Sequence, residues 1–132
     1  MKEKYLFVLR DKKSSIYEFR LASRSLAIIL AKSVDKLFRR KDSKKNFNIV
    51  FIPILRSGLC LLDPFLEVFG NKNPKVGFVG VKRDSITLTT DIYLQSLPKV
   101  KKDDYILILD AMLATGITVC SVIEILKYAG LE

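Results

Sequence analysis

Histidine and tryptophan are absent from this sequence of 132 residues, and cysteine occurs only twice. Without histidine there is no imidazole general base, and a common zinc ligand is missing, so we predict no metal site built by the protein itself. Cys60 and Cys120 both stand among aliphatic residues, which favours two buried small apolar side chains over a disulfide or a metal pair. Any chemistry must use carboxylates, hydroxyls, cations and the backbone.

Long apolar stretches are missing as well. No run reaches the roughly 18 to 20 residues that a membrane-spanning helix needs, and the start from Met1 to Tyr5 lacks the apolar core of a secretion signal. We therefore expect a cytoplasmic protein with no membrane segment. Apolar residues make up 49% of the chain, enough for a modest core, so the length predicts a single domain over 1–132.

Acidic residues are fewer than basic ones, 14 against 23, and the formal net charge is +9. Such a charge attracts anions of several kinds, including nucleotides, RNA and membrane surfaces, and does not choose between them. Much of it falls in 36–45 and 99–102, where a solvated surface with no specific partner is the simpler interpretation. The lysines are not interleaved with aromatic residues in a stacking pattern, so we do not expect nucleic acid as a partner.

Helical spacing is clearest near the start of the chain. Residues 15–39 predict an amphipathic helix, and Ser15 and Glu18 are spaced as in a capping box. Its predicted apolar face consists of Phe19, Ala22, Leu26, Leu30, Val34 and Leu37. The rest of the core is expected over 47–132.

Three apolar runs predict strands, and helical stretches follow two of them. The runs are 48–55, 75–81 and 105–109, and the last is followed by a helical stretch at 121–128. Pro53 is expected to end the first strand, and the segment from Arg83 to Pro98 predicts a small hairpin or flap. Strands that alternate with helices predict an α/β fold, with helices flanking a mostly parallel sheet and ligands bound where the strands end.

The segment from Asp110 to Thr118 joins the third strand to the last helix, with an acid at its start and Thr-Gly-x-Thr at its end. Backbone N–H groups around Thr115 and Gly116 can cradle a phosphate, to which the helix N-terminus adds positive potential. Gly116 would allow the phosphate to approach the backbone closely. An ordinary turn capped by Thr118 explains these four residues equally well.

A family resemblance appears at the same loop. It resembles the phosphoribosyl pyrophosphate loop of uracil phosphoribosyltransferases, Asp-Pro-Met-Leu-Ala-Thr-Gly, and here reads Leu109-Asp110-Ala111-Met112-Leu113-Ala114-Thr115-Gly116. Further stretches resemble the family in the same order: 20–22, then 53–59 with Asp63, then 79–84 with Thr87-Leu88. Together the matches span about 10–130.

The resemblance implies a Rossmann-like phosphoribosyltransferase fold and a reaction. Ribose 5-phosphate would pass from phosphoribosyl pyrophosphate to uracil, giving UMP and pyrophosphate in pyrimidine salvage. It further implies Mg²⁺ held mainly through phosphoribosyl pyrophosphate, with no protein metal site, and the family's usual homodimer. No protein nucleophile is needed, because alignment and electrostatic stabilisation carry such a transfer.

The resemblance also assigns residues. The implied binding site for phosphoribosyl pyrophosphate comprises Arg56, Arg83, Asp110, Ala111, Met112, Leu113, Ala114, Thr115, Gly116, Ile117 and Thr118. Residues 115–118 would hold the 5′-phosphate, Asp110 would face the ribose hydroxyls, and both arginines would contact phosphate or pyrophosphate. Asp110 and Arg56 are the expected catalytic residues. Without the resemblance, Arg56 fits an ordinary surface charge and Arg83 a partner of a neighbouring residue.

Several positions depart from the family pattern. Ala111 replaces its proline, Thr89-Thr90 replaces Glu-Pro, and Ile117 stands where glycine is common, which would strain the backbone if φ were positive there. The chain ends before the Gly-Asp-rich segment that holds uracil in the family. We therefore expect a fold incomplete at its C-terminus, and uracil as a partner only if the missing segment is supplied.

Two consequences follow from that expectation. Missing strands would uncover the apolar side chains of Leu107, Ile123 and Leu126 and leave a sheet edge unpaired. A different function is also open: a non-catalytic regulatory module of the same fold that binds RNA or nucleotide.

Overall fold

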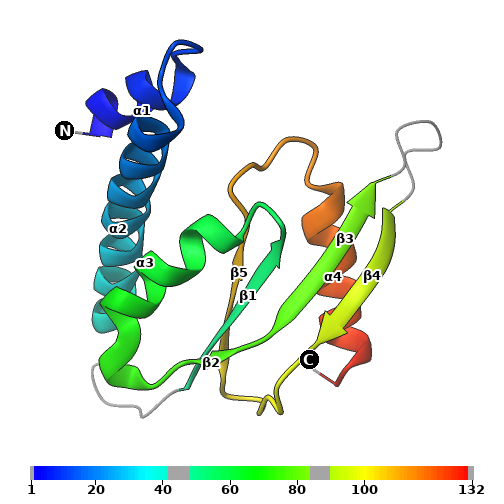
Figure 1. Ribbon diagram of the computed structural model, residues 1–132. Helices are drawn as coiled ribbons and strands as arrows, with labels where there is room; N and C mark the ends of the chain where they lie inside the picture. The colour runs from blue at the N-terminus through cyan, green and yellow to red at the C-terminus, as the bar shows by residue number, and fades with distance from the viewer. Residues whose placement is uncertain (1, 42–47, 84–89, 131–132) are drawn as a thin grey trace.

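The computed structural model describes residues 2–41, 48–83 and 90–130 (Figure 1). In chain order its elements are α1 (Lys2–Arg10), α2 (Ile16–Lys41), β1 (Ile49–Leu55), α3 (Leu59–Phe69), the 3₁₀ turn η1 (Gly70–Lys72), β2 (Lys75–Val76), β3 (Phe78–Arg83), β4 (Thr90–Ser96), β5 (Tyr105–Leu109) and α4 (Ile117–Tyr128). The predicted strands and helices are confirmed, whereas α1 was not predicted. Among these helices none has the length and apolarity needed to cross a bilayer.

Strand β1 is the hub of the sheet. It pairs in parallel with β2, β3 and β5, while β3 and β4 form an antiparallel hairpin. Helices α2 and α3 lie on one side of the sheet and α4 on the other (Figure 1). This arrangement confirms the predicted α/β fold with a mostly parallel sheet and flanking helices. The hairpin or flap predicted over 83–98 differs: the described part of this segment forms one strand, β4, whose hairpin partner is β3, and residues 84–89 lie outside the described residues.

Strand β1 is buried on both faces, which explains its continuous apolar run. Alternate side chains point to opposite faces of a strand, and two separate clusters result. The cluster on the α2 and α3 side contains Ala31, Ile49, Phe51, Phe65, Phe69 and Leu109. The cluster on the α4 side contains Val50, Ile52, Ile54, Val79, Val122 and Leu126. Burying each large side chain contributes roughly 1.5–3 kcal/mol to folding.

The expectation that Pro53 ends the first strand was wrong. Pro53 is fully buried within β1 and lies opposite Leu109 of β5. The strand continues because Ile54 and Leu55 pair with β3. Proline therefore removes one N–H donor here without ending the strand.

The predicted capping box of α2 is confirmed, and the predicted apolar face is correct in part, since Ala22 is buried and Leu26 and Val34 are half-buried. Ser15 N–H donates to Glu18 Oε2 (2.8 Å), and Glu18 N–H donates to Ser15 Oγ (3.2 Å). Besides Ala22, the helix buries two alanines that were not predicted, Ala27 and Ala31. Phe19, Leu30 and Leu37 are each 47% exposed or more. Small side chains let the long helix pack closely against its neighbours, and the larger ones are left at the rim.

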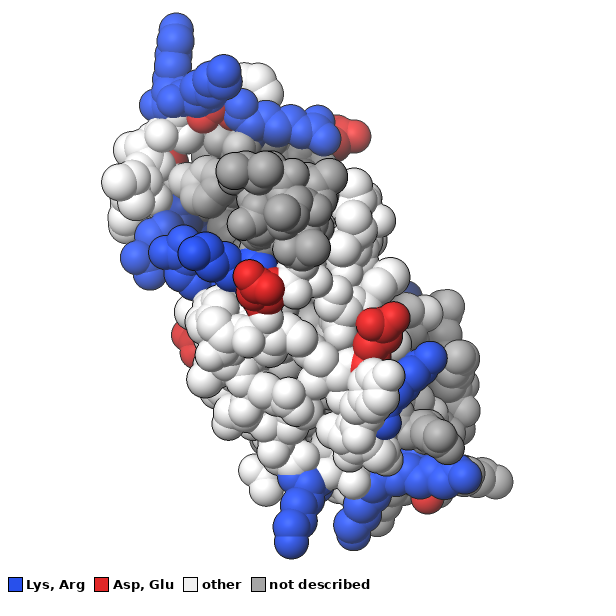
Figure 2. Space-filling model, turned by 90° about the vertical axis from the view of Figure 1, so that its right-hand side faces the viewer, with Lys and Arg blue, Asp and Glu red and all other residues white. Residues whose placement is uncertain are grey.

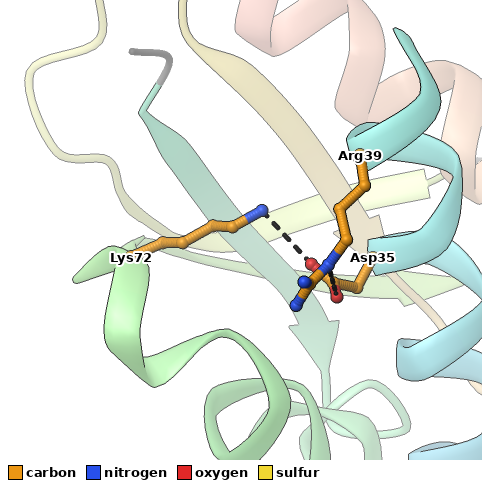
Figure 3. A network of polar contacts seen from close by, with 3 residues as sticks. All are labelled: Asp35, Arg39 and Lys72. Atoms are coloured by element: carbon orange, nitrogen blue, oxygen red, sulfur yellow. Dashed lines mark hydrogen bonds and ion pairs between the residues drawn. The ribbon is translucent and has the colours of Figure 1, made fainter. Parts of the chain in front are cut away.

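Asp35 is buried in line with these alanines because two cations neutralise it (Figure 3). Arg39 Nε donates to its Oδ2 (2.7 Å), and Lys72 Nζ of η1 donates to its Oδ1 (3.2 Å). Burial opposes ionisation, but the hydrogen bonds and charges of Arg39 and Lys72 outweigh it and hold the pKa of Asp35 below its usual value. This network ties α2 to the end of α3.

Three expectations about burial were wrong. Cys60 and Cys120 are both exposed, because each lies in the first turn of its helix on a side that faces away from the core. Leu126 is buried against the sheet rather than uncovered. Leu107 is half-buried and Ile123 is 39% exposed. Within the described residues, β5 pairs with β1 alone, so its other edge is unpaired there.

Candidate active site

The carboxyl ends of β1, β3 and β5 lie at one edge of the sheet, drawn uppermost in Figure 1. Three connections start there: the turn at 56–58, the link from β3 to β4, and the loop at 110–116. Arg83 ends β3 and lies opposite Thr90 of β4 in the ladder. The predicted site segments therefore gather where ligands bind in parallel sheets.

Gly58 packs the turn after β1 directly against the end of β5. Its N–H donates to the Ile54 carbonyl (2.8 Å). A Cβ atom at Gly58 would lie 2.2 Å from the Leu109 carbonyl oxygen and 2.7 Å from the Ile54 nitrogen. Only glycine fits such an approach, so the two strand ends are held together by backbone contact. The Leu55–Arg56 peptide bond that precedes this turn is cis.

The side chains of Ser57 and Asp110 meet across this contact. Ser57 Oγ donates to Asp110 Oδ1 at 2.6 Å, and the Met112 N–H lies 3.4 Å from the same oxygen. Asp110 is half-buried. No role was predicted for Ser57 from the sequence, although a serine followed by a glycine just after a buried strand was a usable signal.

Arg56 is an exposed cation at this edge. Within the described part of the chain its side chain makes no ion pair or hydrogen bond. Arg56 directly precedes Ser57, whose side chain donates a hydrogen bond to Asp110. An unpaired guanidinium at the end of a strand is available to a phosphate or pyrophosphate group, whose oxygens match its donors.

The loop from Ala111 to Thr115 is exposed along its whole length and leads into α4 through Gly116. Gly116 is left-handed, with φ of 79°, and no atom lies within 4 Å of where a Cβ would be. The helix has no side-chain cap, so Thr118 does not cap it, and the first N–H groups of α4 are left for a ligand. Positive φ falls on Gly116 and not on Ile117, so Ile117 carries no such strain.

Two neighbouring features border the loop. Thr90 Oγ1 of β4 lies 2.9 Å from Ser121 Oγ of α4, which joins the hairpin to the helix behind the loop. On the other side, Ala111 borders an open groove of about 1080 Å³ between α2 and α3. Across the groove's far wall Arg24 pairs with Glu67. Sequence reasoning found neither feature, because both depend on side chains far apart in the chain.

Comparison with known proteins gives a consistent result. The sequence pattern of the family described as uracil phosphoribosyltransferase matches residues 36–132. A uracil phosphoribosyltransferase of Aquifex aeolicus is 44% identical over an alignment of 105 positions that covers 74% of this chain and 49% of the relative. One of Mycoplasma mobile is 30% identical over an alignment of 138 positions that covers 95% of this chain and 66% of the relative. The chain thus spans about half to two thirds of these relatives.

Solved structures share the fold. A protein from Aquifex aeolicus superimposes with a TM-score of 0.77 at 32% identity, over 97% of this chain and 67% of the other. A purine phosphoribosyltransferase from Pyrococcus horikoshii gives a TM-score of 0.63 at 20% identity, over 81% of this chain and 67% of the other. None of these four names points to a regulatory or RNA-binding module.

Proposed function

This chain belongs to the uracil phosphoribosyltransferase family, and from that premise we propose that its strand ends bind phosphoribosyl pyrophosphate for transfer of ribose 5-phosphate to uracil, giving UMP and pyrophosphate. The observation that carries the proposal is the junction of Ser57 with Asp110, which joins a turn bearing Arg56 to the loop before α4. The turn carries a cation, the loop carries a carboxylate, and the loop leads into a helix N-terminus without a side-chain cap. These are the groups that a phosphorylated sugar diphosphate requires.

The 5′-phosphate would lie at the start of α4. The helix begins at Ile117 with no side-chain cap, so its first N–H groups are available as donors. The hydroxyls of Thr115 and Thr118 stand on either side of Gly116 in the sequence, and the space around Gly116 is open. Residues 111–114 would form the exposed arch over the ribose.

In the reaction, the C1–O bond to pyrophosphate breaks, a C1–N bond to the pyrimidine forms, and the proton of that pyrimidine N–H ends on the departing pyrophosphate. The electron pair leaves with pyrophosphate, and positive charge develops on the sugar. Asp110 would hold the ribose hydroxyls and offset that charge, while Arg56 and Arg83 would stabilise the leaving group. This is alignment with preorganised electrostatics and needs no protein nucleophile.

Magnesium would enter as part of the substrate. The described residues contain no group of three or more carboxylates or cysteines that could hold a metal ion, and Asp110 is the only carboxylate in its loop. A small hard cation bound to diphosphate oxygens and water fits this donor set. Its chemistry when bound is to neutralise charge on the departing pyrophosphate.

A homodimer is the proposed partner state. Figure 2 shows the side of the molecule on which β4 and α4 lie, where uncharged side chains cover much of the surface, acidic residues stand near the middle, and lysine and arginine lie at the top, at the bottom and along both sides. Exposed on these two elements are Ile92, Tyr93, Leu94 and Ile123. An apolar face of this kind fits a second copy of the chain.

The test is isothermal titration of the chain with phosphoribosyl pyrophosphate and Mg²⁺, followed by assay of UMP formation with uracil. We expect binding in the wild type and a clear loss in Arg56→Ala. Lys127→Ala is the matched control, because it removes the same charge from the last turn of α4. Absence of heat in the wild type would contradict the proposal. A steep salt dependence with preference for one RNA sequence would favour the regulatory alternative instead.

A further inference from the structure

One contact in the site has no assigned role, namely the hydrogen bond from Ser57 to Asp110. Asp110 Oδ1 faces two donors of the protein, the Ser57 hydroxyl at 2.6 Å and the Met112 N–H at 3.4 Å. Within the described residues Oδ2 accepts no hydrogen bond. One oxygen is therefore held by the protein and the other is left for a ligand.

The backbone position of Ser57 is set by the packing of the next residue, Gly58. Gly58 sits so tightly against Leu109 and Ile54 that the turn has little room to move. Leu109 is itself buried and paired with Pro53 in the centre of the sheet. The hydroxyl therefore approaches the carboxylate from a rigid base, which is what orientation of a functional group requires.

We propose that Ser57 is a positioning residue that aims Asp110 Oδ2 at the ribose hydroxyls of the substrate. The inference rests on the proposed function for the identity of the ligand. It adds that the turn bearing Arg56 and the loop bearing Asp110 act as one unit. Ser57 does not touch the substrate in this scheme; it acts through the carboxylate.

The first test needs no ligand. Side-chain couplings of Asp110, measured by NMR in the free protein, should show one χ1 rotamer in the wild type and averaging between rotamers in Ser57→Ala. Ser57→Thr keeps the hydroxyl and should retain the single rotamer. An unchanged Asp110 rotamer in Ser57→Ala would overturn the proposal even if the protein bound no phosphoribosyl pyrophosphate at all.

The second test uses titration with phosphoribosyl pyrophosphate and, separately, with inorganic pyrophosphate. A hydrogen bond to a charged group is worth about a tenfold change in binding. Ser57→Ala should therefore lower the affinity for phosphoribosyl pyrophosphate about tenfold, and Ser57→Thr should keep the wild-type affinity. Affinity for pyrophosphate, which has no ribose, should not change. In an Asp110→Ala background, which has no side-chain acceptor, the Ser57→Ala effect should largely vanish.

Two results separate this inference from the proposed function. Equal loss for both ligands would mean that the hydroxyl supports the turn and not the carboxylate, and would overturn the positioning role. A wild type that binds neither ligand would contradict the proposed function, while the rotamer measurement would still decide the role of Ser57.

Discussion

Gly58 and Leu109 are locked together: a Cβ added to Gly58 would lie 2.2 Å from the Leu109 carbonyl oxygen. The two residues stand at the ends of β1 and β5, which are separated by about fifty residues of chain. Their contact sets the distance between the turn with Arg56 and the loop with Asp110. The geometry of the site thus depends on the absence of a side chain at Gly58.

Gly58→Ala should destabilise the protein by about 1–3 kcal/mol, because the methyl group would meet backbone atoms that cannot rotate away. Gly70→Ala is the control, since no atom lies within 4 Å of a Cβ there and its backbone is helical. That change should be neutral or slightly stabilising. Urea unfolding of both variants measures the difference, and equal stability would show that the turn tolerates a side chain.

Gly116→Ala should weaken binding of phosphoribosyl pyrophosphate by about tenfold or more, because its Cβ would occupy the open space proposed for phosphate. The backbone strain of a side chain at positive φ also costs about 1–2 kcal/mol of stability. Gly130→Ala separates the two effects. Gly130 has a φ of 84° in open space beyond the other end of α4.

Both glycine variants of α4 should lose similar stability in thermal unfolding, but only Gly116→Ala should lose affinity in the titration. Equal affinities of the two variants for phosphoribosyl pyrophosphate would contradict the proposed position of the 5′-phosphate at the start of α4.

Asp35→Asn should cost about 1–3 kcal/mol near neutral pH, because two charge-assisted hydrogen bonds are weakened. The pKa of Asp35 is lowered in the folded protein, so the ionised carboxylate stabilises the fold fully above the unfolded value of about 3.9. That stability is lost as pH falls through the lower folded value. Urea unfolding between pH 7 and pH 3 should show the wild-type advantage constant above about pH 5 and shrinking below pH 4.

The exposed Asp103→Asn variant is the control for this acid effect. It should follow the wild-type curve at every pH. An Asp35→Asn curve parallel to the wild type down to pH 3 would show that Arg39 and Lys72 do not stabilise the ionised form.

Ile123→Glu should reduce self-association if the β4 and α4 face joins two copies of the chain. Leu37→Glu is the matched control, because Leu37 is also exposed but lies on α2, across the sheet. Sedimentation velocity at several protein concentrations measures the effect. A wild type that remains monomeric would exclude a dimer. A loss of association only in Leu37→Glu would place the interface on the α2 side instead.

The sequence predicted the sheet well because burial on both faces leaves a plain signal. An apolar run such as 48–55 has no polar side, and only a covered central strand accommodates it. The phosphate-loop residues could also be predicted, since Asp110 directly follows a strand and Gly116 directly precedes a helix. Their roles as ligand-binding residues remain predictions.

Other features were hidden because they depend on packing between distant segments. The apolar face of α2 was predicted from helical spacing, which correctly included Ala22 but also Phe19 and Leu37, whereas the structure buries alanines where helices pack closely. Cys60 and Cys120 were expected inside because cysteine is usually buried, yet helix rotation exposes both. The Ser57 contact joins residues 53 positions apart, and no local pattern encodes it.

The division of β1 between two clusters also constrains how this chain can change in evolution. Even-numbered side chains of β1 serve the α4 side and Ile49 and Phe51 serve the other, so deleting one residue would exchange the two sets and turn Arg56 to the opposite face. Substitutions of similar volume in β1 are tolerable, whereas insertions or deletions are not. Changes of length must therefore accumulate in the connections outside this strand. The length of β1 thus fixes where the turn with Arg56 lies relative to the rest of the candidate site.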